Sequence, residues 1–247
     1  MSNIFVDSEL SYLFSAANIC IERKEGADGA WQVAPFFCSI PFSEDSYEDM
    51  KKFANSIEEE ISDLYSFGKR RAYKAFGNEV DSVTKPSYLK RINNYNDDGI
   101  DQFENILSIS EKEFNSGGLV FSVFDPMDLI RRKRPGYVPC LVSGSFLVHN
   151  GELQLNAFFR SQSVVEFGVF DLIFLRDFQR KMFEEIKKFR AEEDISIGSL
   201  NLHFARVIIQ RRFARSGKKY LKREEVINNW MSLLEINLLE ARMRSFS

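Results

Sequence analysis

The pair Asn150–Gly151 constrains the fold of this chain more than any other feature of the sequence. It separates two runs of strand-forming residues, 141–149 and 152–159. Asn-Gly between such runs predicts a β-hairpin, because a type I′ turn needs positive φ at both central residues. We expect His149 and Glu152 to flank the turn, which fixes the pairing of all residues along both strands.

This pairing predicts a candidate site at the open end of the hairpin. In a regular register Cys140 lies opposite Ser161, and facing residues point to the same side of a sheet. Arg160 then points to the other side, unless a β-bulge or the strand end redirects it. A guanidinium near the sulfur would lower the pKa of the thiol, and the thiolate is the reactive form. The alternative is that Cys140 is a buried structural thiol, since cysteine packs as a small hydrophobic residue.

The rest of the chain predicts helices alternating with strands. Apolar spacing predicts helices over 8–23, 46–67, 99–113, 170–190 and 222–244, and strands over 31–42, 119–124 and 195–210. Ser46 and Asp49 fit a capping box at the start of the second helix. No linker or repeat divides the sequence, so we expect one domain over residues 1–247. Because the clearest strand pair is antiparallel, the expected fold is α+β, with a mixed sheet and helices packed on one face.

The two faces of the hairpin differ in character. One face is apolar and is expected to be buried; it carries Val142, Phe146, Val148, Leu153, Leu155, Ala157 and Phe159. The other is mostly polar but uncharged; it carries Ser143, Ser145, Gln154 and Asn156, together with Arg160, Leu147 and Phe158. A face of the second kind could pack on another subunit, so we expect a homodimer.

Composition and charge disfavour several classes of function. The net charge is −3, which disfavours nucleic acid as a partner. No apolar run approaches the roughly 20 residues needed to cross a bilayer, so no membrane partner is expected. Three widely spaced cysteines and the absence of a secretion signal at the N-terminus favour a cytoplasmic location. Two histidines are too few for a histidine-rich metal site.

Several motifs together resemble the thymidylate synthase superfamily, and within it the branch of cytidylate hydroxymethylases. The main likeness is Pro139–Cys140 followed 20 residues later by Arg160–Ser161. Further matches are Gly198-Ser-Leu-Asn-Leu-His203, Ile100-Asp101-Gln102, Tyr88 with Arg91, and the strand entering the site, 116–125. The likeness covers roughly residues 85–210. It implies a thymidylate synthase-like α+β fold with the second face of the sheet at a dimer interface.

The resemblance also implies a reaction and roles for residues. Cys140 would be the nucleophile that adds to C6 of a pyrimidine nucleotide monophosphate, which would then accept a one-carbon unit from 5,10-methylenetetrahydrofolate. Arg160 and Ser161 would bind the substrate phosphate. Asp171 would hydrogen-bond the base, and an aspartate at this position favours cytosine over uracil. The implied product is therefore a 5-hydroxymethylated cytidine nucleotide (CMP or dCMP).

Four further residues receive implied roles, and an alternative is left open for three of them. Glu60 would be the catalytic glutamate that polarises the base through water, or a solvated helix residue. Asn201 and His203 would contact the sugar, or be satisfied polar groups on a strand. Tyr88 belongs to a reduced substrate-binding motif. Asp171 itself could be the N-cap of the helix that follows it.

The sequence also departs from the resembled family. Gly117–Gly118 replaces an arginine pair that binds phosphate in a partner subunit, and Phe159 replaces a glutamine. Ser163 stands where the family has a folate-contacting aspartate. The basic segment Arg131–Arg134 could restore the lost charge, bind nucleic acid or be a solvated loop. These departures motivate a second hypothesis: a catalytically inactive relative that binds a nucleotide for sensing or regulation.

Overall fold

The computed structural model describes residues 2–24, 29–60, 88–95, 98–130, 138–211, 213–214 and 220–244. Helices combine with strands that pair in both parallel and antiparallel directions, which confirms the coarse α+β class. The chain forms two compact units. Unit 1 comprises Met1–Arg71, Ser161–Ile173 and Phe204–Ser247, and unit 2 comprises Ala72–Arg160 and Phe174–His203. None of the described helices is long and apolar enough to cross a membrane.

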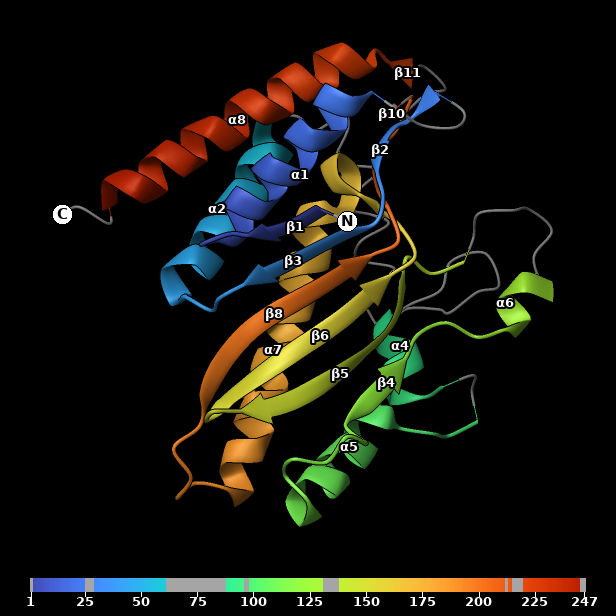
Figure 1. Cartoon of the computed structure of the whole chain (residues 1–247), viewed down its shortest axis with the longest axis vertical. Coiled ribbons are helices and arrows are strands. Elements are labelled where there is room, and N and C mark those ends of the chain that lie inside the picture. The colour runs from blue at the N-terminus through green and yellow to red at the C-terminus, as the bar shows by residue number, and fades with distance from the viewer. Residues whose placement is uncertain are drawn as a thin grey trace. The chain divides into compact units, whose positions relative to one another are not determined.

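Unit 1 contains three long helices and several short strands (Figure 1). Its helices are α1 (Glu9–Arg23), α2 (Glu44–Glu60) and α8 (Arg223–Arg244). Its strands are β1 (Ser2–Phe5), β2 (Trp31–Val33), β3 (Phe36–Ile40), β7 (Gln162–Ser163), β9 (Val207–Ile209), β10 (Phe213–Ala214) and β11 (Tyr220–Leu221). The π-helical turn η2 (Val164–Gly168) leads from β7 into α7 (Val169–Phe189), and the boundary between the units falls within α7.

Two strands predicted from the sequence are each divided into two strands in the structure. The predicted strand 31–42 is two strands: β2 pairs antiparallel with β9, whereas β3 pairs parallel with β1. The predicted strand 195–210 also divides, because β8 (Ser196–Phe204) ends before Ala205 and β9 begins at Val207. In both cases the strand-like pattern continues across a short break, at 34–35 and 205–206, that separates the two strands.

The helices of unit 1 pack through aromatic residues. Tyr12 of α1 stacks on Phe204 at 5.8 Å and meets Phe36 edge-on at 6.0 Å between ring centroids. Phe53 of α2 contacts Trp230 of α8 at 5.6 Å. The helix predicted over 8–23 is confirmed, with the hydroxyl of the N-cap Ser8 accepting from the N–H of Ser11.

The predicted capping box of α2 is wrong. The helix begins at Glu44, so Ser46 and Asp49 both lie inside it. The hydroxyl of Ser46 instead donates to the carboxylate of Glu9, which is fully buried. A long-range partner on α1 therefore replaces the local cap that the sequence suggested.

Unit 2 is built around four strands and the second part of α7 (Figure 1). Its strands are β4 (Val120–Ser122), β5 (Leu141–His149), β6 (Glu152–Phe159) and β8, in the order β8-β6-β5-β4. Its other helices are α4 (Tyr88–Asn93), α5 (Gln102–Lys112) and α6 (Met127–Ile130). The hairpin β5–β6 has the predicted turn, with φ of 53° at Asn150 and 77° at Gly151.

One face of these strands packs on α7. Phe178 lies 5.2 Å from Phe121 and 5.3 Å from Phe146 between ring centroids. Gln179, which is fully buried, donates from its side-chain amide to the carbonyls of Leu153 and Gly198. These contacts tie α7 to β6 and β8, and they bury the face that the hairpin pattern predicted to be apolar.

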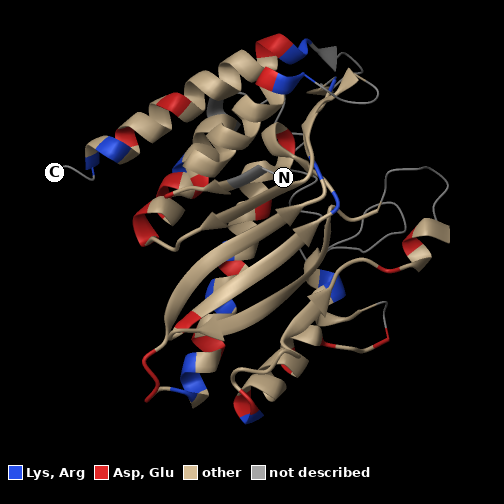
Figure 2. Cartoon of the chain, viewed as in Figure 1, with Lys and Arg blue, Asp and Glu red and all other residues tan. Residues whose placement is uncertain are grey.

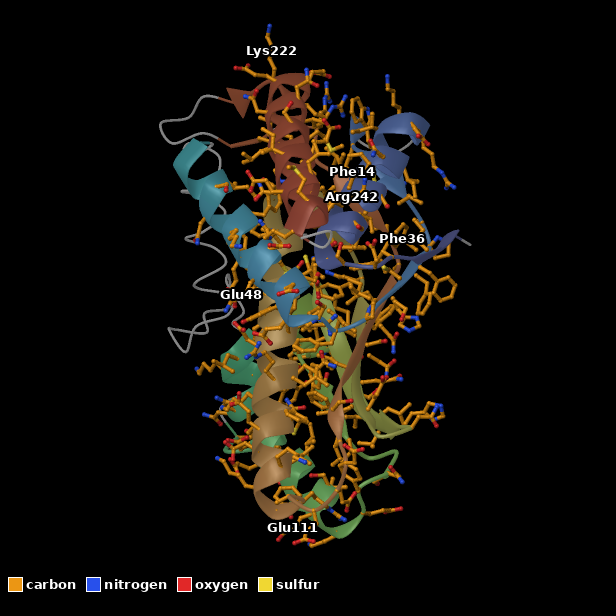
Figure 3. The ribbon with its side chains drawn as sticks, turned by 90° about the vertical axis from the view of Figure 1, so that its left-hand side faces the viewer. Phe14, Phe36, Glu48, Glu111, Lys222 and Arg242 are labelled. Atoms are coloured by element: carbon orange, nitrogen blue, oxygen red, sulfur yellow. The ribbon has the colours of Figure 1, made fainter. Side chains whose placement is uncertain are left out.

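No described helix of unit 2 covers the other face of these strands, which carries few charges apart from Glu152 next to the turn. Figure 2 shows the four strands almost without charged residues, and in Figure 3 α7 runs along one side of them. Val120, Leu147 and Phe158 are 55%, 42% and 43% exposed on this uncovered face. The register pairs Val120 with Ser145 and Leu147 with Gln154, so apolar side chains lie opposite polar ones on this face.

Candidate functional site

The pairing of β5 with β6 changes near its open end. From His149–Glu152 to Ser143–Phe158 the register is the predicted one, but Leu141 then pairs with Phe159. The irregularity lies at Val142, whose carbonyl accepts from the N–H groups of both Val123 and Phe124, at 2.8 and 3.0 Å. A β-bulge at this residue therefore adds one position to β5.

The bulge corrects the predicted position of Cys140. The N–H of Arg160 donates to the carbonyl of Cys140 at 2.9 Å, so Cys140 faces Arg160 and not Ser161. The fully buried Leu141, and not Val142, lies opposite Phe159 on the apolar face. Sequence reasoning had named a bulge as the condition for bringing Arg160 to the cysteine, and the structure contains one.

The guanidinium of Arg160 binds the backbone immediately before the cysteine. Its Nε donates to the carbonyls of Pro139 and Val138, at 2.9 and 3.2 Å, and an Nη also donates to Val138. Arg160 is partly buried. It therefore fixes the approach of the chain to Cys140 with charge-assisted hydrogen bonds.

Tyr88 holds the backbone on the other side of the cysteine. Its hydroxyl accepts a hydrogen bond from the N–H of Leu141 at 3.3 Å, and its ring packs on Phe174 at 5.6 Å between centroids. Only 6% of Tyr88 is exposed. The structure thus gives Tyr88 a contact that positions the main chain next to Cys140, whereas the resemblance implied contact with substrate.

The three cysteines differ in their surroundings. Burial raises the pKa of Cys20 and of Cys38 to about 12, so both remain thiols at neutral pH. Cys140 is half-buried. Because a reactive cysteine must be reached by its target, Cys140 is the better candidate nucleophile of the three.

Asn201 and His203 lie on β8 in unit 2. The side-chain amide of Asn201 donates to the side-chain oxygens of Asn156 and Gln154, at 3.1 and 3.3 Å. This agrees with the alternative of a satisfied polar group on a strand. His203 is exposed.

Asp171 lies in the interior of unit 1, inside the first turn of α7, so it is not the N-cap of that helix. It is 3% exposed, and its Oδ2 accepts from Nε2 of Gln162 at 3.0 Å. Burial raises the pKa of Asp171 from 3.8 to about 7, against the opposing effect of the Gln162 hydrogen bond. The carboxyl group can therefore carry a proton near neutral pH.

A second hydrogen bond links Gln162 to α1. The hydroxyl of Tyr12 donates to Oε1 of Gln162, and both residues are almost completely buried. Burial also raises the pKa of Tyr12 well above its usual value, so the hydroxyl stays protonated. Sequence reasoning missed Gln162 and Tyr12. The available signal was a polar residue directly after Arg160–Ser161.

The remaining predicted residues are placed as follows. Ser161 is 5% exposed and directly precedes β7. Ser163 donates from its hydroxyl to the carboxylate of Glu166 at 3.0 Å. Gly117–Gly118 lies in a turn before β4. Glu60 is the last residue of α2, and its side chain lies outside the described part of the structure, as do Arg131–Arg134 and the end of the helix predicted over 46–67.

Within the described ranges, no group of three or more His, Cys, Asp or Glu side chains could hold a metal ion. No family model matches the chain, and no curated protein matches its sequence.

Proposed function

We propose that this chain transfers a one-carbon unit to C5 of a cytidine nucleotide, with Cys140 as the nucleophile. The observation that carries the proposal is the bulge at Val142, which sets the half-buried Cys140 opposite Arg160. Arg160 and Tyr88 hold the backbone before and after the cysteine. Such preorganisation is what a nucleophile needs in order to meet a bound ring at a fixed position.

In the proposed reaction the Cys140 thiolate adds to C6 of the pyrimidine, which makes C5 nucleophilic. 5,10-Methylenetetrahydrofolate would supply the one-carbon unit at the oxidation level of formaldehyde. The C5 proton would be lost and tetrahydrofolate released, which would leave an exocyclic methylene group on the ring. Water would add to that carbon and the Cys140 thiolate would leave C6, giving the 5-hydroxymethyl nucleotide. Arg160 and Ser161 would bind the phosphate, Asn201 and His203 the sugar, and Glu60 would polarise the base through water.

Asp171 is proposed to select the base. Cytosine offers an amino donor and the acceptor N3, whereas uracil offers the acceptor O4 and the donor N3–H. A protonated carboxyl group has one accepting and one donating oxygen, which matches cytosine. The raised pKa of Asp171, caused by its burial, makes this form available at neutral pH.

The folate is proposed to contact the turn after β7. Ser163 replaces the acidic residue of the resembled family, but its hydroxyl is bonded to the carboxylate of Glu166. This pair keeps a carboxylate close to position 163. It could accept hydrogen bonds from the amino group of a pterin ring.

Mass spectrometry tests the nucleophile directly. Incubation with a 5-fluorocytidine nucleotide and methylenetetrahydrofolate should give a covalent adduct on Cys140, because fluorine at C5 blocks the later loss of a proton. Cys140→Ser should abolish the adduct. Cys38→Ala, which removes a fully buried thiol, should retain it. Absence of any adduct on the wild-type chain would refute the enzymatic proposal.

A second candidate is a catalytically inactive nucleotide-binding protein. It is favoured by the turn at Gly117–Gly118, which has no cationic side chain at the place of the arginine pair. In that case cytidine nucleotides should raise the melting temperature without forming an adduct. The two measurements on one sample therefore separate the candidates.

We also propose that the chain forms a homodimer through the uncovered face of unit 2. Apart from Glu152 next to the turn, its strands carry few charges, and they expose Val120, Leu147 and Phe158. Phe158→Arg should shift the sedimentation coefficient from dimer to monomer, because a buried unpaired charge is costly at an interface. A wild-type chain that sediments as a monomer at micromolar concentration would refute this part.

A further inference from the structure

Two buried hydrogen bonds, one with Tyr12 and one with Asp171, fix which end of the Gln162 side-chain amide faces each residue. A primary amide has an accepting oxygen and a donating nitrogen, and either end can face a carboxyl group. The hydroxyl of Tyr12 donates to Oε1, which leaves Nε2 to donate to Asp171. Because burial keeps Tyr12 protonated, this hydroxyl remains a donor. Tyr12 therefore determines which end of Gln162 meets the carboxyl group.

The contact makes the two oxygens of Asp171 chemically different. Oδ2 accepts from Gln162, and among the described residues no hydrogen bond reaches Oδ1. An oxygen that faces an N–H donor is the poorer place for a proton, since a proton there would oppose the donor. A protonated Asp171 thus carries its proton on Oδ1 and keeps Oδ2 as an acceptor.

The backbone of Gln162 is held independently of its side chain. Its N–H donates to the carbonyl of Arg206 at 3.0 Å, and β7 pairs parallel with β9. The same strand β9 contacts α1, because the thiol of Cys20 lies 3.5 Å from the carbonyl oxygen of Val207. The donor Tyr12 and the acceptor Asp171 therefore meet a glutamine whose main chain is anchored in a sheet.

We propose that Gln162, oriented by Tyr12, is a specificity-positioning residue: it fixes the arrangement of donor and acceptor on Asp171 so that the carboxyl group matches cytosine and not uracil. The inference rests on the proposed function, in which Asp171 contacts the base. Without Gln162 the proton can occupy either oxygen, and the carboxyl group can serve either base. Gln162 itself touches neither substrate nor the reacting atoms in this proposal.

Binding of cytidine and uridine monophosphates, measured by calorimetry about one pH unit below the pKa of Asp171, tests the proposal. Gln162→Met keeps the volume of the side chain and removes the donor. It should reduce the cytidine-to-uridine affinity ratio about tenfold, the equivalent of one hydrogen bond to a carboxyl group. Tyr12→Phe should reduce the ratio by a smaller factor, about threefold, because the amide keeps its contact but loses its fixed direction.

The matched control is Ser46→Ala. Like Gln162→Met, it removes a buried side-chain donor to a carboxyl group of unit 1, but here the donor is a hydroxyl and the acceptor is Glu9. This variant should leave the affinity ratio unchanged. A merely structural role of Gln162 would weaken both nucleotides equally, which also leaves the ratio unchanged and would overturn the inference.

The failure of the inference is distinguishable from that of the proposed function. If the wild-type chain prefers cytidine monophosphate and Gln162→Met retains that preference, the inference fails and the function stands. If the wild-type chain binds neither nucleotide, the function fails and the inference falls with it.

A nucleotide-free measurement guards against a variant that binds poorly because it folds poorly. NMR titration of the Asp171 carboxyl carbon should give a higher pKa in Gln162→Met than in the wild type, because the lost hydrogen bond is the contact that lowers it. An unchanged titration midpoint would show that Gln162 does not hold the carboxyl group, and would overturn the inference.

Discussion

Asp128 in unit 2 and Asp171 in unit 1 are both buried carboxyl groups, 6% and 3% exposed, but they have different partners. Both oxygens of Asp128 pair with the guanidinium of Arg91, at 2.7 and 2.8 Å. Asp171 meets a neutral amide at 3.0 Å. The carboxylate of Asp128 joins α4 to α6. Asp171 has no cationic partner among the described residues, and burial raises its pKa to about 7. Charge compensation in the interior favours structure, and its absence yields a group suited to chemistry.

The largest effect is expected for Asp128→Asn. Arg91 also donates to the carbonyl of Val123, and it is 6% exposed, so the variant leaves a buried guanidinium without its carboxylate. Breaking such a pair costs about 3–5 kcal/mol of the free energy of unfolding. Urea denaturation at neutral pH measures the loss, and Asp98→Asn, at an exposed carboxylate, is the control. A loss no larger than that of the control would contradict the structural role.

Asp171→Asn should change the pH dependence of stability. Because the folded state raises the pKa from 3.8 to about 7, it binds the proton more tightly than the unfolded chain. The free energy of unfolding therefore falls as pH rises through this interval, and the full penalty, about 4 kcal/mol, is present above it. The difference between wild type and variant, measured from pH 4 to pH 8 in steps of about one unit, isolates this group. A flat difference curve would refute the raised pKa.

Arg91→Lys separates the effect of charge from that of hydrogen-bond geometry in the Arg91–Asp128 pair. Lysine keeps the cation but lacks the planar fork that contacts both oxygens of Asp128 and the carbonyl of Val123. We expect a loss of about 2 kcal/mol in the free energy of unfolding, smaller than that of Asp128→Asn. Equal losses in the two variants would mean that the fork matters as much as the charge.

The smallest effect is expected for Tyr12→Phe, which lies near Asp171 in unit 1. The variant leaves Oε1 of Gln162 without its buried donor, which should cost about 1–2 kcal/mol of the free energy of unfolding. The aromatic contacts of Tyr12 with Phe36 and Phe204 remain possible, so the core should not rearrange. Chemical denaturation at a pH below the pKa of Asp171 measures this loss. A loss as large as that of Asp128→Asn would show that the Tyr12–Gln162 hydrogen bond stabilises the fold as much as the Arg91–Asp128 ion pair does.

Local signals in the sequence predicted the regular parts of the molecule. The Asn150–Gly151 turn fixed the register as far as Ser143, since a two-residue turn leaves no freedom of pairing. Apolar periodicity located α1, α5, α7 and α8 within a few residues of their ends. These predictions needed only neighbours in the chain.

The parts that were not predicted depend on distant partners. The bulge at Val142 is accompanied by two N–H donors from residues 123 and 124, which no pattern within the hairpin reveals. Gln162 meets Tyr12 across 150 positions of sequence. Asp171 was predicted to contact the base, but its burial and its raised pKa follow from packing that only the folded chain defines.

The inserted residue at Val142 makes the two arms of the hairpin unequal. Deleting Val142 would remove the bulge, so that each residue of β5 would pair with one residue of β6 to the end of the hairpin. Leu141 would still face Phe159 and Cys140 would still face Arg160, because the deletion removes only the position that has no partner of its own on β6. One position of β5 is therefore surplus to the pairing, whereas Gly144 of the same strand leaves no room for a side chain, because a Cβ there would lie 2.6 Å from the carbonyl oxygen of Asn156.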